Sequence, residues 1–229
     1  SFRLPFLFQK MAGIYIHIPF CKTKCSYCDF YSITNIKENK KQVINSICKE
    51  LILKKDILAK EKIKTIYFGG GTPSLLNKKE LSQILNGIHE NYQTASCIEI
   101  SIEANPDDLS TSYIKNLIKI GFNRISIGVQ SFNDKELKFI NRRHSSLKAI
   151  NAIKRCQTNG FRNISIDLIY GIPSQTLDSL KKNIHIASNL NVQHISAYHL
   201  IYEENTALYQ SLIKKEINPI EEDLSLQMF

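Results

Sequence analysis

Short β-branched runs alternate along the chain with longer amphipathic stretches. Alternation of apolar and polar positions predicts six strands, at residues 13–18, 63–68, 98–103, 124–129, 163–169 and 193–198. A helical period predicts helices at 37–60, 78–91, 109–120, 133–140, 146–158 and 176–190. Gly121 and Gly160 stand where helix C-caps belong, each just before the next strand. This order predicts an α/β fold with a parallel sheet and right-handed crossovers.

The predicted strands have one aliphatic and one polar face. In the fourth strand, for example, Ile125 and Ile127 alternate with Ser126 and Gly128. A doubly wound sheet has helices on both sides and would need two apolar faces. A partial barrel with a ligand in its polar interior explains the pattern better. The carboxyl ends of the strands, where βα barrels carry their active sites, would then bring together Glu103, Gln130 and Asp167.

Composition and charge leave a soluble, cytoplasmic globular protein as the expectation. The chain has 229 residues, enough for one sizeable domain, and no apolar stretch long enough to span a membrane. Residues 1–10 lack a signal-peptide core, and we expect a non-native or upstream extension before a natural start at Met11. The net charge of +9 comes from scattered lysines, so we do not expect nucleic acid as a partner.

Three cysteines lie within eight residues, in the loop after the first predicted strand: Cys21, Cys25 and Cys28. Without a secretory signal they do not suggest disulfides, whereas three thiolates at this spacing can wrap one metal centre. A [4Fe–4S] cluster normally takes four thiolates, so three leave one iron open to a reacting ligand. Zinc with His17 as the fourth ligand, or a purely structural thiol cluster, is the alternative. We expect core positions for the isolated Cys48, Cys97 and Cys156.

The C-x3-C-x2-C loop after a first strand resembles the signature of radical S-adenosylmethionine (SAM) proteins. Further motifs resemble the oxygen-independent coproporphyrinogen oxidase family, which includes the HemW-type haem chaperones: GIYIHIPFC, CDFYS, YFGGGTPS, EANPDD, GFNRISIGVQSF, IDLIYGIPSQT and HISAYHLIYEENTALY. The resemblance runs from about Tyr15 to about Tyr209. It implies a partial (βα)6 TIM-like barrel over 11–215. Residues 216–229 would then begin a C-terminal domain that is otherwise missing.

The resemblance also implies cofactors and ligands. A [4Fe–4S] cluster would be held by Cys21, Cys25 and Cys28, and SAM would chelate its open iron and be cleaved to a 5′-deoxyadenosyl radical. The loop of Gly70, Gly71 and Thr72 would contact the SAM amino group, because glycines let backbone atoms approach a ligand closely.

The same family pattern implies further SAM contacts at strand ends. Glu103 would lie beside the amino acid end of SAM, and Gln130 and Asp167 would bind the ribose hydroxyls. The guanidinium of Arg142 suits the SAM carboxylate, with Arg143 as the alternative. Two aromatic residues match positions near the cluster and adenine, although strand aromatics also fit a core: Tyr15 and Tyr27. We expect His17 to be a hydrogen-bonded interior residue.

The residue at position 30 distinguishes two functions within the family that these motifs resemble. Coproporphyrinogen dehydrogenases carry a further cysteine at this position, two residues after the third cysteine, and this chain has phenylalanine. We therefore expect a haem chaperone that carries haem as cargo, passes it to haem-accepting proteins and receives electrons from a donor. SAM cleavage is compatible with this, and coproporphyrinogen dehydrogenase activity is the alternative. RNA modification, suggested only by the charge, is a third hypothesis.

Overall fold

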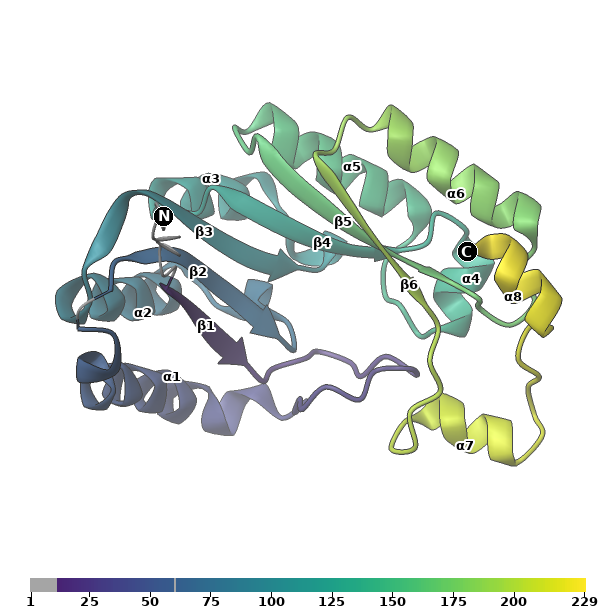
Figure 1. Cartoon of the computed structure of the whole chain (residues 1–229), viewed down its shortest axis with the longest axis horizontal. Helices are drawn as coiled ribbons and strands as arrows, with labels where there is room; N and C mark the ends of the chain where they lie inside the picture. Colours follow the sequence, from purple (N-terminus) through teal and green to yellow (C-terminus); the bar gives the residue numbers. More distant parts are fainter. Residues whose placement is uncertain (1–11, 60) are drawn as a thin grey trace, which may run out of the picture.

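The computed structural model describes residues 12–59 and 61–229. Six parallel strands form one sheet in the order β1-β2-β3-β4-β5-β6, so each βα unit adds a strand beside the previous one. The sheet curves but does not close, and β1 and β6 are its two edges (Figure 1). The expected partial (βα)6 barrel is therefore confirmed. The strands are β1 (Ala12–Ile18), β2 (Ile63–Gly70), β3 (Thr94–Ala104), β4 (Arg124–Gln130), β5 (Asn163–Tyr170) and β6 (His194–His199).

The helices lie along the outer side of the sheet (Figure 1). Helices α2 and α5 begin at Lys78 and Ser146, the first residues of the predicted ranges 78–91 and 146–158. Helix α2 also has a full capping box between Asn77 and Glu80. Gly121 and Gly160 follow helix ends with φ of 107° and 111°, as expected for C-caps. The helices are α1 (Ile36–Leu53), α2 (Lys78–Asn91), α3 (Thr111–Lys119), α4 (Asp134–Phe139), α5 (Ser146–Thr158), α6 (Leu177–Asn189), α7 (Ala207–Ile213) and α8 (Glu222–Met228).

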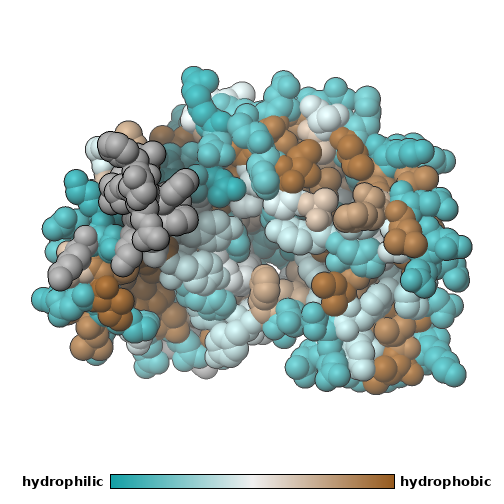
Figure 2. All heavy atoms as spheres, in the orientation of Figure 1, coloured by the Kyte–Doolittle hydropathy of each residue, from teal (hydrophilic) through white to brown (hydrophobic). Residues whose placement is uncertain are grey.

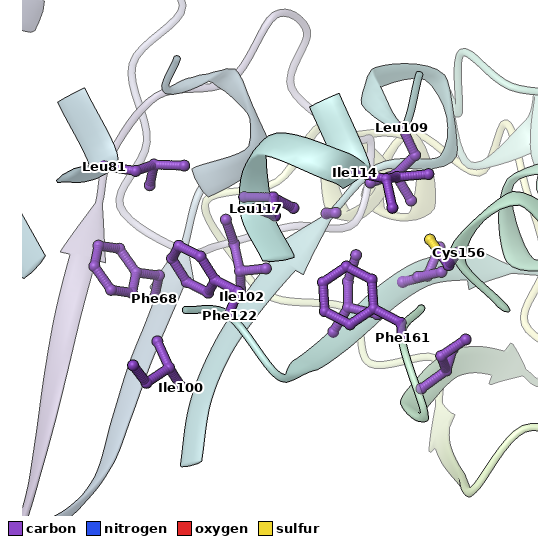
Figure 3. Close-up of a cluster of buried hydrophobic side chains, with 14 of the residues drawn as sticks. Phe68, Leu81, Ile100, Ile102, Leu109, Ile114, Leu117, Phe122, Cys156 and Phe161 are labelled. Carbon is purple, nitrogen blue, oxygen red and sulfur yellow. The ribbon is translucent and has the colours of Figure 1, made fainter. Parts of the chain in front are cut away.

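The aliphatic faces of the strands form the main core against the helices. Figure 3 shows this layer, in which the rings of Phe68 and Phe122 meet edge to face at 5.2 Å and Cys156 is fully buried. The opposite face of the sheet is polar and lines the interior. Figure 2 shows a hollow in the middle of the molecule, bordered by pale and hydrophilic residues. The predicted division into an aliphatic outer and a polar inner face is confirmed for β1 to β5, whereas β6 contributes no residue to this core and its Ile195 is 38% exposed.

Three details differ from the sequence expectation. The helix predicted at 37–60 is α1 followed by a 3-10 turn at Lys55–Leu58. No residue of that turn is fully buried, and Leu58 alone packs partly against the main core. Helix α7 was not predicted because its 7 residues are too few to show a helical period. Cys97 is exposed rather than in the core, because it lies in an irregular part of β3 between the pairs Ile63↔Thr94 and Thr65↔Glu99.

The remaining expectations concern the two ends of the chain and the absence of a membrane-spanning segment. Residues 1–10, the expected extension, lie outside the described residues. Helix α8 packs against α6 of the predicted core, and the boundary at 215/216 stays a prediction. In the described part of the chain, no helix is both long and apolar enough to cross a membrane.

Candidate functional site

A cavity of about 730 Å³ opens at the carboxyl ends of the strands. It is bordered by the loop that follows β1, by the loops after β2 to β4, and by the inner faces of β3 to β6. Residues from elements far apart in the sequence meet here: Cys21, Cys25, Tyr27, Cys28, Phe30, Gly70, Gly71, Thr72, Glu103, Asn105, Ser126, Gln130, Arg142, Ser165, Asp167 and Tyr198. All but one of the expected site residues line this cavity. The exception is Tyr15.

The loop with the three cysteines is fixed at both ends and in its middle. At its base, Ile33 N–H donates to the carbonyl of Pro19 and Cys21 N–H donates to the carbonyl of Ile33, at 2.7 and 3.0 Å. At Ser26 the loop meets the opposite side of the barrel, where Leu208 N–H donates to the Ser26 carbonyl at 2.8 Å. The loop therefore crosses the gap between the two edges of the open sheet.

A second, smaller hydrophobic cluster anchors the middle of this loop. The side chain of Tyr27 packs against a group of buried residues at the end of α4, in β5 and the loop after it, after β6, and in α7. The group consists of Ile140, Ile169, Ile172, Leu200 and Leu208. Burial raises the pKa of the Tyr27 hydroxyl well above its usual range. Tyr27 therefore contributes a neutral phenol to the cavity wall beside Cys25 and Cys28.

The three thiols are half-buried and border the same cavity. Thr72 Oγ1 donates to Cys21 Sγ at 3.4 Å, and Arg142 Nη1 donates to Cys25 Sγ at 3.3 Å. Burial raises the pKa of the Cys28 thiol, and the neighbouring Cys25 and Cys21 raise it further. Within the described ranges, no three His, Cys, Asp or Glu side chains form a ready-made metal-ligand group. The three thiols have to converge on a ligand.

This donor set fits an iron–sulfur cluster with three protein ligands. Three thiols of one loop face one cavity, and hydrogen-bond donors already reach two of the sulfurs, as in cluster sites generally. The zinc alternative needs His17, whose Nε2 and Nδ1 lie 3.0 Å from the Tyr31 carbonyl oxygen and 3.3 Å from the Tyr15 hydroxyl. The expectation that His17 is hydrogen-bonded is confirmed, but the residue is only half-buried and does not border the main cavity.

Two glycines, the last residue of β2 and the one that follows it, let the chain turn tightly against the cysteine loop. Gly70 has a φ of 106°, and a Cβ there would meet the His17 ring at 2.6 Å. A Cβ on Gly71 would come within 2.8 Å of the Phe20 carbonyl and 2.9 Å of the Ile18 carbonyl. Gly71 N–H donates to the same Ile18 carbonyl at 2.8 Å. The glycines therefore place Thr72 beside Cys21.

We expect Gly71→Ala to lower the free energy of unfolding by roughly 1–3 kcal/mol, because its Cβ would collide with backbone that cannot move away. Gly87→Ala is the control. Its Cβ, in helix α2, would touch only Leu51 Cδ1 at 3.5 Å, so this variant should gain about 0.5–1 kcal/mol. Urea denaturation of both variants checks the prediction. Equal stability of Gly71→Ala and the parent chain would contradict it.

Glu103 lies at the end of β3, held by two donors. Tyr67 Oη donates to Oε1 at 2.8 Å, and Gly70 N–H donates to Oε2 at 3.1 Å. Burial raises the pKa of the Glu103 carboxyl, and the Tyr67 hydrogen bond opposes that rise.

The ring of Tyr15 stacks on the ring of Tyr67, with 6.0 Å between the ring centres, but Tyr15 is 57% exposed. The alternative reading of Tyr15 as a core residue is therefore wrong.

Gln130 ends β4, as expected, whereas Asp167 lies within β5, which continues to Tyr170. Ser126 Oγ donates to Asp167 Oδ1 at 3.3 Å. Burial raises the pKa of the Asp167 carboxyl, while hydrogen bonds from Ser126 and Ser196 and the charge of Arg142 work in the opposite direction. Gln130 has a φ of 68° at a register shift between β4 and β5. Such left-handed non-glycine residues cluster at functional sites.

Arg142 is held inside the cavity wall, whereas Arg143 is at the rim. Arg142 Nη2 donates to the Gly128 carbonyl at 2.6 Å and to Asn105 Oδ1. Its Nε is buried without a hydrogen-bond partner. Arg143 lies 3.7 Å from the carboxylate of Asp108, whose side chain is 4% exposed and which also pairs with Lys22 at 2.7 Å. Sequence reasoning missed Asn105, although its position just before Pro106 at the end of β3 is a usable signal.

The chain was compared with known proteins. The sequence profile of the Radical SAM superfamily matches residues 15–187. The heme chaperone HemW of Lactococcus lactis is 37% identical over 97% of this chain, and that of Escherichia coli is 37% identical over 85%. The heme chaperone HemW of Buchnera aphidicola from Acyrthosiphon pisum is 41% identical over 88%. This chain spans 58%, 52% and 54% of these relatives, respectively.

The solved structures include the coproporphyrinogen III oxidase HemN of Escherichia coli, a radical SAM enzyme. It is 27% identical over 96% of this chain, which covers 50% of that structure, with a TM-score of 0.84. The profile match covers most of the chain, from β1 into α6, and includes all three clustered cysteines and the other residues that border the cavity on β2 to β5. The chain therefore belongs to the Radical SAM superfamily.

Proposed function

We propose that this chain is the cofactor-binding core of a haem chaperone that holds a [4Fe–4S] cluster and SAM, binds haem and passes it to haem-accepting proteins. The observation that carries the proposal is the set of curated relatives. Those compared are 33–41% identical over 85–97% of this chain and are named heme chaperone HemW. Because this chain spans only 52–58% of their length, haem binding and transfer belong to the proposal.

In this proposal the cysteine loop holds the cluster. Cys21, Cys25 and Cys28 supply three thiolates, and the absence of a fourth thiol along the described cavity wall leaves one iron open. When bound, the cluster and SAM supply a one-electron reductant and a 5′-deoxyadenosyl radical. An electron-donor protein would be a further partner.

The residues around the thiols have the right chemistry for the rest of SAM. The backbone of Gly70 and Gly71, with Thr72, would accept the amino acid end together with Glu103. Asp167 and Gln130 offer acceptors for two adjacent ribose hydroxyls. The unpartnered N–H of Arg142 Nε could donate to the SAM carboxylate without breaking the contacts that Nη1 and Nη2 make.

Apolar residues at the cavity rim suit a flat macrocycle. Phe30, Tyr198 and Ile201 line the cavity yet are 61%, 57% and 64% exposed. Exposed apolar side chains gathered at a cavity mouth mark binding surfaces. We propose that these three side chains contact the haem face, with Phe30 in place of the extra cysteine of coproporphyrinogen dehydrogenases.

The alternative function is oxidation of coproporphyrinogen III, which the fold likeness to HemN favours. The test uses the full-length protein with its cluster, SAM, a reductant, an electron acceptor and coproporphyrinogen III under anaerobic conditions, and haem is added in a separate assay. We expect stoichiometric haem binding, transfer of haem to an apo-haemoprotein, and no multiple-turnover formation of protoporphyrinogen. Protoporphyrinogen produced over many turnovers, with no haem transfer, would overturn the proposal.

A further inference from the structure

Three hydrogen-bonded side chains link Cys21 to Cys25. Thr72 Oγ1 donates to Cys21 Sγ at 3.4 Å, and Asn105 Nδ2 donates to Thr72 Oγ1 at 3.4 Å. Asn105 Oδ1 accepts from Arg142 Nη2, and Arg142 Nη1 donates to Cys25 Sγ at 3.3 Å. The residues come from three different βα loops. Together they form a continuous hydrogen-bonded path from one thiol to the other.

This path is built into the interior. Thr72 is 5% exposed, and the Gly128 carbonyl fixes Arg142 Nη2 at 2.6 Å from inside the barrel. Asn105 is also held by its own backbone, since its N–H donates to Ser74 Oγ at 3.3 Å. These contacts hold the two donors in place independently of the thiols. The donors are therefore positioned before a ligand arrives.

The charge on Arg142 has no carboxylate partner. Among the described residues, no Asp or Glu oxygen lies within ion-pair distance of its guanidinium, whereas the neighbouring Arg143 is paired with Asp108. A buried cation is costly unless an anion offsets its charge. Asp107 and Asp167 interact with this charge only beyond ion-pair distance. Cys25 accepts directly from Arg142 Nη1 at 3.3 Å and would be a thiolate when it ligates iron. The guanidinium is therefore placed to offset the negative charge of a cluster.

The geometry points to Thr72, Asn105 and Arg142 as positioning residues that orient Cys21 and Cys25 and raise the reduction potential of the cluster. This inference rests on the proposed cluster. Reduction adds one electron, taken from a low-potential reductant, and no proton. Hydrogen bonds to the sulfurs and a nearby positive charge stabilise the more negative, reduced state. Their removal should therefore make the cluster harder to reduce.

The test measures the midpoint potential of the reconstituted protein by redox titration with electron paramagnetic resonance (EPR), without SAM or haem. We expect Arg142→Gln to shift the reduction equilibrium about tenfold toward the oxidised cluster, or about 59 mV more negative for a one-electron couple. Thr72→Val, which keeps the shape and loses the hydroxyl, should shift it in the same direction by less. Arg142→Lys keeps the charge and should give an intermediate potential.

Lys119→Gln is the control. It removes one positive charge from the exposed end of helix α3, away from the cavity, so its potential should equal that of the parent protein. Unchanged potentials in both Arg142→Gln and Thr72→Val, at full iron content, would overturn the inference and leave the proposed function standing. Failure of the parent protein to assemble a cluster would instead refute the proposed function. If Arg142→Gln loses iron, the midpoint potential of Thr72→Val alone tests the inference.

Discussion

Replacing any one of Cys21, Cys25 or Cys28 with alanine is expected to abolish the cluster, from close to four irons in the parent protein to nearly none. Three thiolates are the fewest that can hold such a centre here. Among the described residues no other cysteine borders the cavity to replace one that is lost. Iron and sulfide analysis after anaerobic reconstitution, with the visible absorption spectrum, measures the effect.

The other cysteines provide the matched controls. Cys97→Ala changes an exposed residue and Cys48→Ala a half-buried one, and neither lines the cavity. Both variants should keep the iron content of the parent. Cys156→Ala makes a small cavity in the core and should lower stability without affecting iron. A cluster that survives in Cys25→Ala, or one lost in Cys97→Ala, would contradict the ligand assignment.

Asp167→Ala is expected to weaken SAM binding by roughly ten- to hundredfold while iron content stays unchanged. A hydrogen bond that involves a charged group contributes about 1.5–3 kcal/mol, and Asp167 would accept from the ribose hydroxyls. Equilibrium titration of SAM, followed by EPR of the reduced cluster, measures the affinity. Glu90→Ala, on the exposed side of α2, is the control and should not change it.

The pKa of Asp167 adds a pH dependence to this prediction. Burial raises the pKa of its carboxyl above the ordinary value of 3.8. A protonated carboxyl loses an acceptor, so SAM affinity should fall as the pH drops, and at a higher pH than an exposed aspartate would give. The SAM affinity of the Asp167→Ala variant should not show this fall at low pH. Unchanged SAM affinity in Asp167→Ala would remove this residue from the site.

Much of the fold follows from local patterns in the sequence. Alternation in strands such as β4 and β5 is clear because one face packs against helices and the other faces a polar interior. Helix α7 was not predicted because its 7 residues are too few to show a helical period, although Leu208 and Leu212 stand at helical spacing. Its start was nevertheless signalled by Thr206, whose side chain caps the helix by accepting from Tyr209 N–H.

The candidate site was only partly predictable for a different reason. Inner-face residues such as Glu103 and Asp167 can be placed from parity alone, since polar positions alternate with the aliphatic ones that face the helices. The link from Thr72 through Asn105 to Arg142 depends on three loops meeting in space, which no local pattern encodes. The same holds for the contact between Ser26 and Leu208, which ties the cysteine loop to the far edge of the sheet.

The central claim is that three thiols of this chain hold a cluster whose open iron binds SAM. EPR spectroscopy of the anaerobically reconstituted and reduced protein, recorded with and without SAM, tests it most directly. We predict close to four irons per chain, the signal of a reduced [4Fe–4S] cluster, and a change in that signal when SAM is added. Stoichiometric zinc that reconstitution does not displace, or a cluster signal that SAM leaves unaltered, would contradict the claim.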